Sequence, residues 1–244
     1  KDLRAALRGL AGAAKKLVVL DLDDTLWGGI VGDVGWEHLA LGGHDALGES
    51  YVDFQRHLLA LSRRGVLLAV VSKNEESVAL EAIARHPAMV IKADDLAIYK
   101  INWRDKAANI AELVAELNLG MQSVVFIDDN PVERARVREA LPEVFVPEWP
   151  EDKLLYTQAL SELRCFDTPA LSREDLERTR MYAAERNREA LKKSVGSIDD
   201  WFMSLGTKVR FAPLDASNVT RTVQLLNKTN QMNLSTRRLG EPEL

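Results

Sequence analysis

Residues 17–25 read LVVLDLDDT, and this stretch decides the fold. The four apolar residues from Leu17 to Leu20 form an uninterrupted run, which is typical of a strand buried on both faces of a parallel sheet. The run ends at Asp21, and Asp23 and Asp24 follow at once. Ligands of open parallel sheets bind at the carboxyl ends of the strands. The stretch therefore predicts an inner strand that delivers carboxylates to a binding edge.

Strands and helices alternate on both sides of this run. Further strands are predicted at 66–71, 89–91, 123–127 and 144–147. Helices are predicted at about 49–63, 73–84, 103–117 and 133–140. Such alternation predicts an α/β fold, a doubly wound parallel sheet.

The pattern changes after Pro150 and becomes mainly helical. Three parts are predicted: an N-terminal helix or linker over 1–16, a catalytic domain over 17–150, and a third part over 151–244. We expect this third part to be a helical appendage that leads into an incomplete second domain. Its clearest element is an amphipathic helix at 218–230.

Bulk composition excludes several classes of protein. The chain has 244 residues, 46% of them hydrophobic, and a formal net charge of −5. This acidity argues against nucleic-acid binding, which needs a basic face. No apolar run approaches the roughly 18–20 residues that span a bilayer, so no membrane partner is expected. A single cysteine cannot form an internal disulfide, and a cytoplasmic location is the default expectation.

Polar residues follow three of the predicted strands. Asp21 ends the first, Ser72 follows the second, and Asp128 and Asp129 follow the strand at 123–127. Acidic groups that converge at one edge repel each other unless a cation lies between them. Because the ligands are hard oxygens without histidine or cysteine, Mg²⁺ is the expected ion.

The spacing of these residues suggests their roles. Asp21 would attack phosphorus and form an aspartyl-phosphate. Asp23 would offer its backbone carbonyl to the metal, while its side chain protonates the leaving oxygen and later deprotonates water. Ser72 and the N–H groups beside it would hold a phosphate oxygen. Lys106 would supply a fixed positive charge.

Asp129 would complete the metal shell. Asp128 would either ligate the metal or orient a water and Lys106.

A simpler interpretation treats such acids as solvated turn formers or helix caps, and we adopt it for Asp24 and Asp33. Lys100 competes with Lys106 for the lysine role, although Lys106 precedes the Asp128 strand by one helix. Ser72 alone would be an ordinary N-cap.

DLDDT, VVSKN, Lys106 and IDDN resemble the four motifs of the haloacid dehalogenase superfamily. The resemblance implies a Rossmann-like fold and phosphoryl transfer. It also implies substrate contacts for Thr25, Lys73 and Asn74, which lie in or beside these motifs. The insertion after the first strand is short, so a capless member with a flap at about 27–49 is expected.

A narrower resemblance rests on DLDDTLWGGIVGD, INWRDKAANI, FIDDNPVERARV and LLNKTNQMNLSTRR. Together these segments are similar to the FkbH-like glyceryl transferase/phosphatase family of polyketide biosynthesis. The resemblance implies D-1,3-bisphosphoglycerate as substrate and an acyl carrier protein as the acceptor of a glyceryl thioester. It also implies that the last segment leads into an acetyltransferase-like domain.

Two further predictions depend on this narrower resemblance. Cys165 could carry the glyceryl group as a thioester, although a lone cysteine beside Phe166 is also a plausible small hydrophobe. Asn230 and Gln231 could bind glycerate or phosphate, although their segment could equally be a frayed helix end.

Three hypotheses follow. The first is glyceryl transfer coupled to dephosphorylation. The second is a capless phosphatase that acts on a phosphoprotein or small phosphoester without acyl transfer. The third is a regulatory module with a vestigial site, against which the second carboxylate at Asp23 argues.

Overall fold

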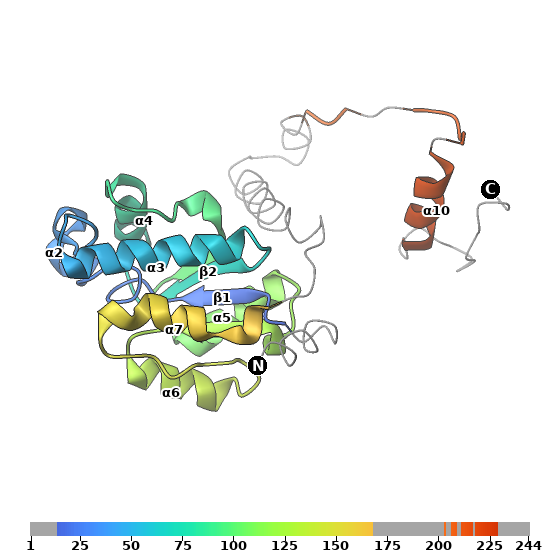
Figure 1. The fold of residues 1–244 in the computed structure, drawn as a ribbon. Helices are drawn as coiled ribbons and strands as arrows, with labels where there is room; N and C mark the ends of the chain where they lie inside the picture. The colour runs from blue at the N-terminus through green and yellow to red at the C-terminus, as the bar shows by residue number, and fades with distance from the viewer. Residues whose placement is uncertain (1–13, 168–202, 204–205, 209–210, 217, 229–244) are drawn as a thin grey trace. The chain divides into compact units, whose positions relative to one another are not determined.

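A computed structural model describes residues 14–167, 203, 206–208, 211–216 and 218–228 (Figure 1). The chain divides into two compact units, Lys1–Ser194 and Val195–Leu244. In the described part of the second unit there is one helix, α10 (Val219–Lys228). No helix among the described residues is long and apolar enough to cross a membrane.

The first unit is built on a parallel sheet of four strands in the order β3-β2-β1-β4. The strands are β1 (Leu17–Leu20), β2 (Leu67–Ser72), β3 (Leu96–Ile101) and β4 (Val124–Ile127). Every residue of β1, β2 and β4 is buried, as their continuous apolar sequences predict. β1 therefore lies between β2 and β4.

Helices cover both faces of the sheet. The helices that pack on one face are α3 (Ala46–Ser62), α4 (Glu76–Arg85) and α7 (Tyr156–Glu162), and those on the other are α5 (Lys106–Glu116) and α6 (Pro131–Ala140). Alternate residues of β1 divide between the two cores, because Val18 and Leu20 face the first group while Leu17 and Val19 face the second. The predicted doubly wound layering is confirmed.

Two strand predictions need correction. Met89 and Ile91 are buried, but they lie in an irregular segment before β3 rather than in a strand. β3 itself was not predicted, because LAIYKI mixes apolar and polar residues, as the half-exposed edge of a sheet does. Residues 144–147 contribute only an isolated bridge, from Phe145 to Val125 of β4.

The insertion between β1 and α3 is a flap. Residues 21–45 contain only α2 (Val31–Val34) and a 3-10 helix at Trp36–His38. Paired backbone hydrogen bonds between Gly28 and Ala40 close the base of the flap. A Cβ at Gly28 would lie 2.9 Å from the Ala40 Cβ, so only glycine fits there.

The segment after Pro150 packs on the first unit instead of standing apart from it. Tyr156, Leu160 and Phe166 are buried in the same core as β1 and α3. Tyr156 lies in edge-on and tilted contact with Phe54 and Trp149, at centroid distances of 5.6 and 5.2 Å. The described part of the predicted appendage, up to residue 167, is thus part of the compact unit.

Candidate active site

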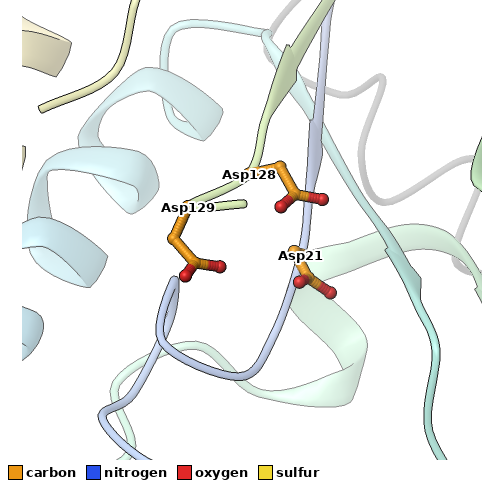
Figure 2. Close-up of side chains that lie close together, drawn as sticks. All are labelled: Asp21, Asp128 and Asp129. Carbon is orange, nitrogen blue, oxygen red and sulfur yellow. The ribbon is translucent and has the colours of Figure 1, made fainter. Parts of the chain in front are cut away.

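Three carboxylates meet at the carboxyl edge of the sheet. Asp21 follows β1, and Asp128 and Asp129 follow β4, with the Asp21 backbone N–H donating to the Ile127 carbonyl at 3.0 Å. One carboxylate oxygen from each of the three lies within 4.8 Å of the others. Figure 2 shows their side chains turned toward a common space. Adjacent parallel strands ending at the same level bring these distant residues together.

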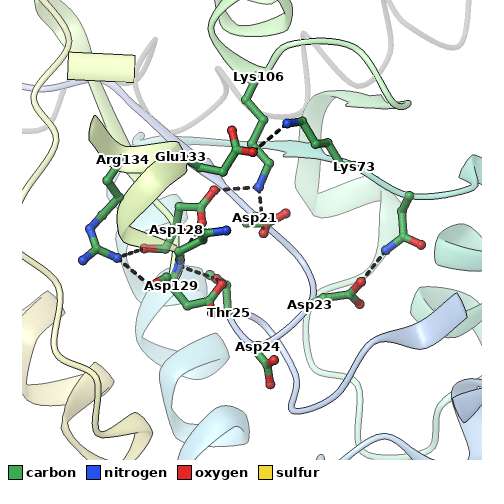
Figure 3. A network of polar contacts seen from close by, with 12 residues as sticks. Asp21, Asp23, Asp24, Thr25, Lys73, Lys106, Asp128, Asp129, Glu133 and Arg134 are labelled. Atoms are coloured by element: carbon green, nitrogen blue, oxygen red, sulfur yellow. Dashed lines mark hydrogen bonds and ion pairs between the residues drawn. The ribbon is translucent and has the colours of Figure 1, made fainter. Parts of the chain in front are cut away.

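Lys106, the first residue of α5, lies between two of these carboxylates. Its Nζ is 2.8 Å from Asp21 Oδ2 and 2.6 Å from Asp128 Oδ2, and its side chain is only 4% exposed (Figure 3). Burial alone would lower the pKa of Lys106, but the two carboxylates outweigh burial and hold it above its ordinary value. Lys106 is therefore a permanent ammonium group.

Lys100, the competing candidate, pairs instead with Glu112 and Glu116 of α5. The structure thus places Lys106, and not Lys100, beside the carboxylates.

One lysine does not neutralise this cluster. Burial, together with the charge of Asp21, raises the pKa of Asp128 to about 7, even though Lys106 opposes the shift. Asp21 Oδ1 is buried and has no hydrogen-bond partner among the described residues. A buried carboxylate oxygen without a partner is costly, and a hard cation would satisfy it. The donor set of Asp21, Asp128 and Asp129 therefore fits a divalent metal with oxygen ligands.

The Asp23 carboxylate points away from this cluster and is held by three donors. It accepts hydrogen bonds from Trp27 Nε1 at 2.8 Å, from the Val31 backbone N–H at 3.1 Å, and from Asn74 Nδ2 at 2.7 Å. Burial raises the pKa of the Asp23 carboxyl above its ordinary value, although these hydrogen bonds oppose the shift. A raised pKa suits a group that must give up a proton.

Two residues that were expected to contact substrate form hydrogen bonds with carboxylates of the site. Thr25 is fully buried, and its Oγ1 accepts from the Asp129 backbone N–H at 3.1 Å and donates to Asp129 Oδ1 at 3.4 Å. Asn74 is 3% exposed and donates to Asp23. Each side chain therefore positions a carboxylate, and the predicted contacts of Thr25 and Asn74 with substrate stay predictions.

The other residues predicted around β2 lie at the expected edge. Ser72 is the last residue of the strand and is buried. Lys73 follows it and pairs with Glu133 across a distance of 2.6 Å.

Cys165 does not lie at this site. Its carbonyl oxygen accepts from the Lys15 backbone N–H at 2.8 Å, at the amino end of β1. Asp21 lies at the opposite end, six residues further along an extended chain, which corresponds to roughly 20 Å. The Cys165 side chain packs against the apolar core as a partly buried hydrophobe. The structure therefore gives no support to a thiol carrier beside Asp21.

Asn230 and Gln231 lie outside the described residues, so the structure does not place them.

Sequence reasoning missed a lysine and a tyrosine that reach the site from the segment after Pro150. Lys153 Nζ donates to the Asp24 carbonyl at 3.1 Å and lies 3.4 Å from Asp129 Oδ2. Tyr156 OH donates to the same Asp24 carbonyl at 3.2 Å and accepts from Lys153 at 2.9 Å. Tyr51 OH adds a longer contact of 3.4 Å.

These donors explain the conformation of Asp24. Its φ is +51°, in the left-handed region that ordinary residues avoid. The Asp24 side chain accepts from the Gly29 backbone N–H at 3.0 Å, as the prediction of a turn-forming residue requires. The strained turn thus fixes the loop that carries Asp23 on one side and Thr25 on the other.

Arg134 of α6 is the third residue missed. Its guanidinium donates to the Asp128 and Asp129 backbone carbonyls at 2.8 and 2.6 Å. It holds the turn between β4 and α6 and thereby the two carboxylates (Figure 3).

Comparisons with known proteins support the fold. No family model matches the chain, and no curated protein matches it. Among solved structures, it is similar to the N-terminal part of the protein BF1531 from Bacteroides fragilis, which contains a phosphatase domain and is complexed with Mg. The TM-score is 0.67 at 44% identity, over 69% of this chain and 45% of that one.

The chain thus spans less than half the length of this neighbour. The likeness confirms the predicted fold class, and this chain contains a domain with the fold of that phosphatase domain.

Proposed function

We propose that this chain is a Mg²⁺-dependent phosphatase of the haloacid dehalogenase type, with Asp21 as its nucleophile. The observation that carries the proposal is the buried contact of Lys106 with both Asp21 and Asp128, beside an Asp21 oxygen that has no hydrogen-bond partner in the described part of the chain. The Mg-bound phosphatase domain that resembles this chain supports the choice of ion. Asp21, Asp128 and Asp129 would hold the ion through their carboxylates, and Asp23 through its backbone carbonyl.

Asp21, Asp23 and Lys106 have different roles in the proposed hydrolysis. A bound Mg²⁺ would reduce the repulsion between the Asp21 carboxylate and a phosphate dianion. An Asp21 oxygen attacks phosphorus, the bond to the leaving oxygen breaks, and Asp23 donates a proton to that oxygen. Water then attacks the aspartyl-phosphate and gives its proton to Asp23, which releases phosphate and restores both carboxyl groups. Lys106 keeps the nucleophile in place throughout.

A finer proposal concerns the substrate. The motif segments that resemble the FkbH-like family favour D-1,3-bisphosphoglycerate, with transfer of the glyceryl group to an acyl carrier protein in polyketide biosynthesis. The insertion after β1 carries only a short flap, and an uncapped site would admit a protein acceptor. The alternative is phosphate removal from a phosphoprotein or a small phosphoester without acyl transfer. The Cys165 thiol is no part of either version, because it lies at the other end of β1.

One experiment separates these versions. The full chain is incubated with Mg²⁺, bisphosphoglycerate and an acyl carrier protein, and both phosphate release and the intact mass of the carrier are followed. Phosphate release together with a glyceryl adduct on the carrier supports transfer. Phosphate release alone supports the simpler phosphatase. Absence of phosphate release from bisphosphoglycerate, acetyl phosphate and p-nitrophenyl phosphate would exclude the proposed activity.

A further inference from the structure

An ion pair spans the end of β1, where the nucleophile lies. Lys73 directly follows β2, and Glu133 lies in the first turn of α6, which follows β4. Because β2 and β4 flank β1 in the sheet, a contact between these two residues must pass over the end of β1. Lys73 Nζ lies 2.6 Å from Glu133 Oε1, and Figure 3 shows the pair beside Lys106 and Asp21.

Burial of the two partners is unequal. The Glu133 side chain is 15% exposed, whereas the Lys73 side chain is 38% exposed. The Asp21 side chain beside them is 10% exposed. The pair therefore lies beside the space over Asp21, and the lysine is the more accessible partner.

The two lysines at this edge, Lys106 and Lys73, differ in burial and in the number of carboxylates that they contact. Lys106 is buried, and two carboxylates hold it in place at 2.8 and 2.6 Å. Among the residues that the structure describes, Lys73 has one carboxylate partner, and its side chain is partly solvated. A partly exposed ion pair contributes little net free energy, so exchange of the carboxylate for a phosphate dianion costs little.

We propose that the Lys73–Glu133 pair is an exchangeable anion site, in which Lys73 leaves Glu133 to bind a second anionic group of the substrate. Glu133 sets specificity, because a ligand must compete with its carboxylate for the lysine. The substrate class is then a phosphate compound whose leaving group carries another phosphate or carboxylate. This inference rests on the proposed function, since it assumes that the phosphoryl group occupies the space over Asp21.

The test is a binding measurement in the full chain carrying Asp21→Asn, so that the ligand is not consumed. Calorimetry with Mg²⁺ gives the affinities for inorganic phosphate and for 3-phosphoglycerate, which has both a phosphate and a carboxylate. Lys73→Met and Glu133→Gln are added separately. Lys100→Met is the matched control, because Lys100 also pairs with glutamates and its side chain is 23% exposed, but its partners lie on α5.

Opposite shifts are expected from the two partners. Lys73→Met weakens 3-phosphoglycerate about tenfold more than it weakens phosphate, because a charge-assisted hydrogen bond is lost. Glu133→Gln strengthens 3-phosphoglycerate binding about fivefold, because a competing charge about 4 Å away is removed. Lys100→Met changes neither affinity.

Several results would overturn the inference. They are equal losses for both ligands in Lys73→Met, weaker binding in Glu133→Gln, and no measurable 3-phosphoglycerate binding in the parent protein. Phosphate release by the unsubstituted chain is measured in parallel. If no release occurs while the opposite shifts are present, the proposed function fails and the anion site stands.

Discussion

The Nζ atom of Lys106 lies 2.8 Å from Oδ2 of Asp21, in a position where the side chain of each is nearly inaccessible to solvent. The two residues are far apart in sequence: Asp21 directly follows β1, and Lys106 is the first residue of α5. A buried carboxylate keeps its charge only when a cation stabilises it. This contact therefore places a fixed positive charge directly beside the proposed nucleophile.

Removal of the Lys106 ammonium group should affect both activity and stability. We expect Lys106→Met to lower phosphate release by at least about 100-fold, because the charge that steadies Asp21 is lost. It also leaves two buried carboxylates unpaired, which costs about 3 kcal/mol of unfolding free energy in metal-free protein. Enzyme assays and urea unfolding measure the two effects. Lys100→Met is the control, and an equal loss of activity there would remove the special role of Lys106.

Replacement of the nucleophile separates activity from folding. We expect Asp21→Asn to reduce phosphate release by about 1,000-fold or more, because an amide is a poor nucleophile. Its stability without metal should be equal to or higher than that of the parent, since one of the repelling charges is gone. Phosphate assays and urea unfolding report the result. Residual activity within tenfold of the parent would show that another group attacks phosphorus.

Much of this site could be predicted because its residues lie at ends of buried strands. LVVL marks β1 with its bounds, and the position of Asp21 after it follows from the alternation of strands and helices. Lys106 could be ranked above Lys100 from its place before β4. What the pattern could not show was that Thr25 and Asn74 turn inward to Asp129 and Asp23, because a short polar side chain in a loop fits either role.

The indole of Trp27 tunes the proposed general acid. Its Nε1 donates to Asp23 Oδ1 at 2.8 Å, which stabilises the charged carboxylate and lowers the pKa of Asp23 against the effect of burial. Trp27→Phe removes this donor, so the pKa of Asp23 should rise further. The alkaline limb of the kcat/KM profile, which reports the free enzyme's essential acid, should then move to higher pH.

Trp36→Phe in the flap is the control for that profile. Trp36 also packs against the core, but Asp23 accepts no hydrogen bond from it. A shift of the alkaline limb to lower pH in Trp27→Phe, or an equal shift in both variants, contradicts Asp23 as the acid.

The turn at Asp24 depends on donors from outside its own loop. Tyr156→Phe keeps the aromatic packing but loses the hydrogen bond of 3.2 Å to the Asp24 carbonyl. We expect a loss of about 1 kcal/mol in unfolding free energy and a fall of a few-fold in kcat as Asp23 loosens. Tyr51→Phe should cost less, because its contact is 3.4 Å long. Urea unfolding of both variants checks the order, and the reverse order would contradict this explanation.

Lys153 and Tyr156 escaped prediction for a physical reason. EDKLLY has the polar and apolar mixture of any surface helix, and nothing local shows that this segment returns to the carboxyl edge of the sheet. Its return depends on tertiary packing of Tyr156 against Phe54 and Trp149. Arg134 is similar, since an arginine in a charged helix is usually a solvated residue, whereas this one is buried beneath the β4 turn.

Stabilisation by Mg²⁺ should depend on pH in a definite direction. Burial raises the pKa of Asp128 from 3.8 to about 7, so between these values the folded state holds a proton that the unfolded chain has released. The unfolding free energy of metal-free protein therefore falls as pH rises through this window. Mg²⁺ binds the deprotonated carboxylates, so the increase in Tm that it causes should be larger at pH 8 than at pH 5.

Thermal unfolding with Mg²⁺ and with EDTA measures this difference, and Asp128→Asn is the matched variant. It removes the titrating group, so the fall in metal-free stability between pH 5 and 8 should become smaller, and the increase in Tm with Mg²⁺ should shrink at pH 8. Two results would contradict the proposal that the Asp128 carboxylate binds Mg²⁺. One is a Mg²⁺ effect on Tm of the same size at both pH values, and the other is an Asp128→Asn variant that behaves like the parent.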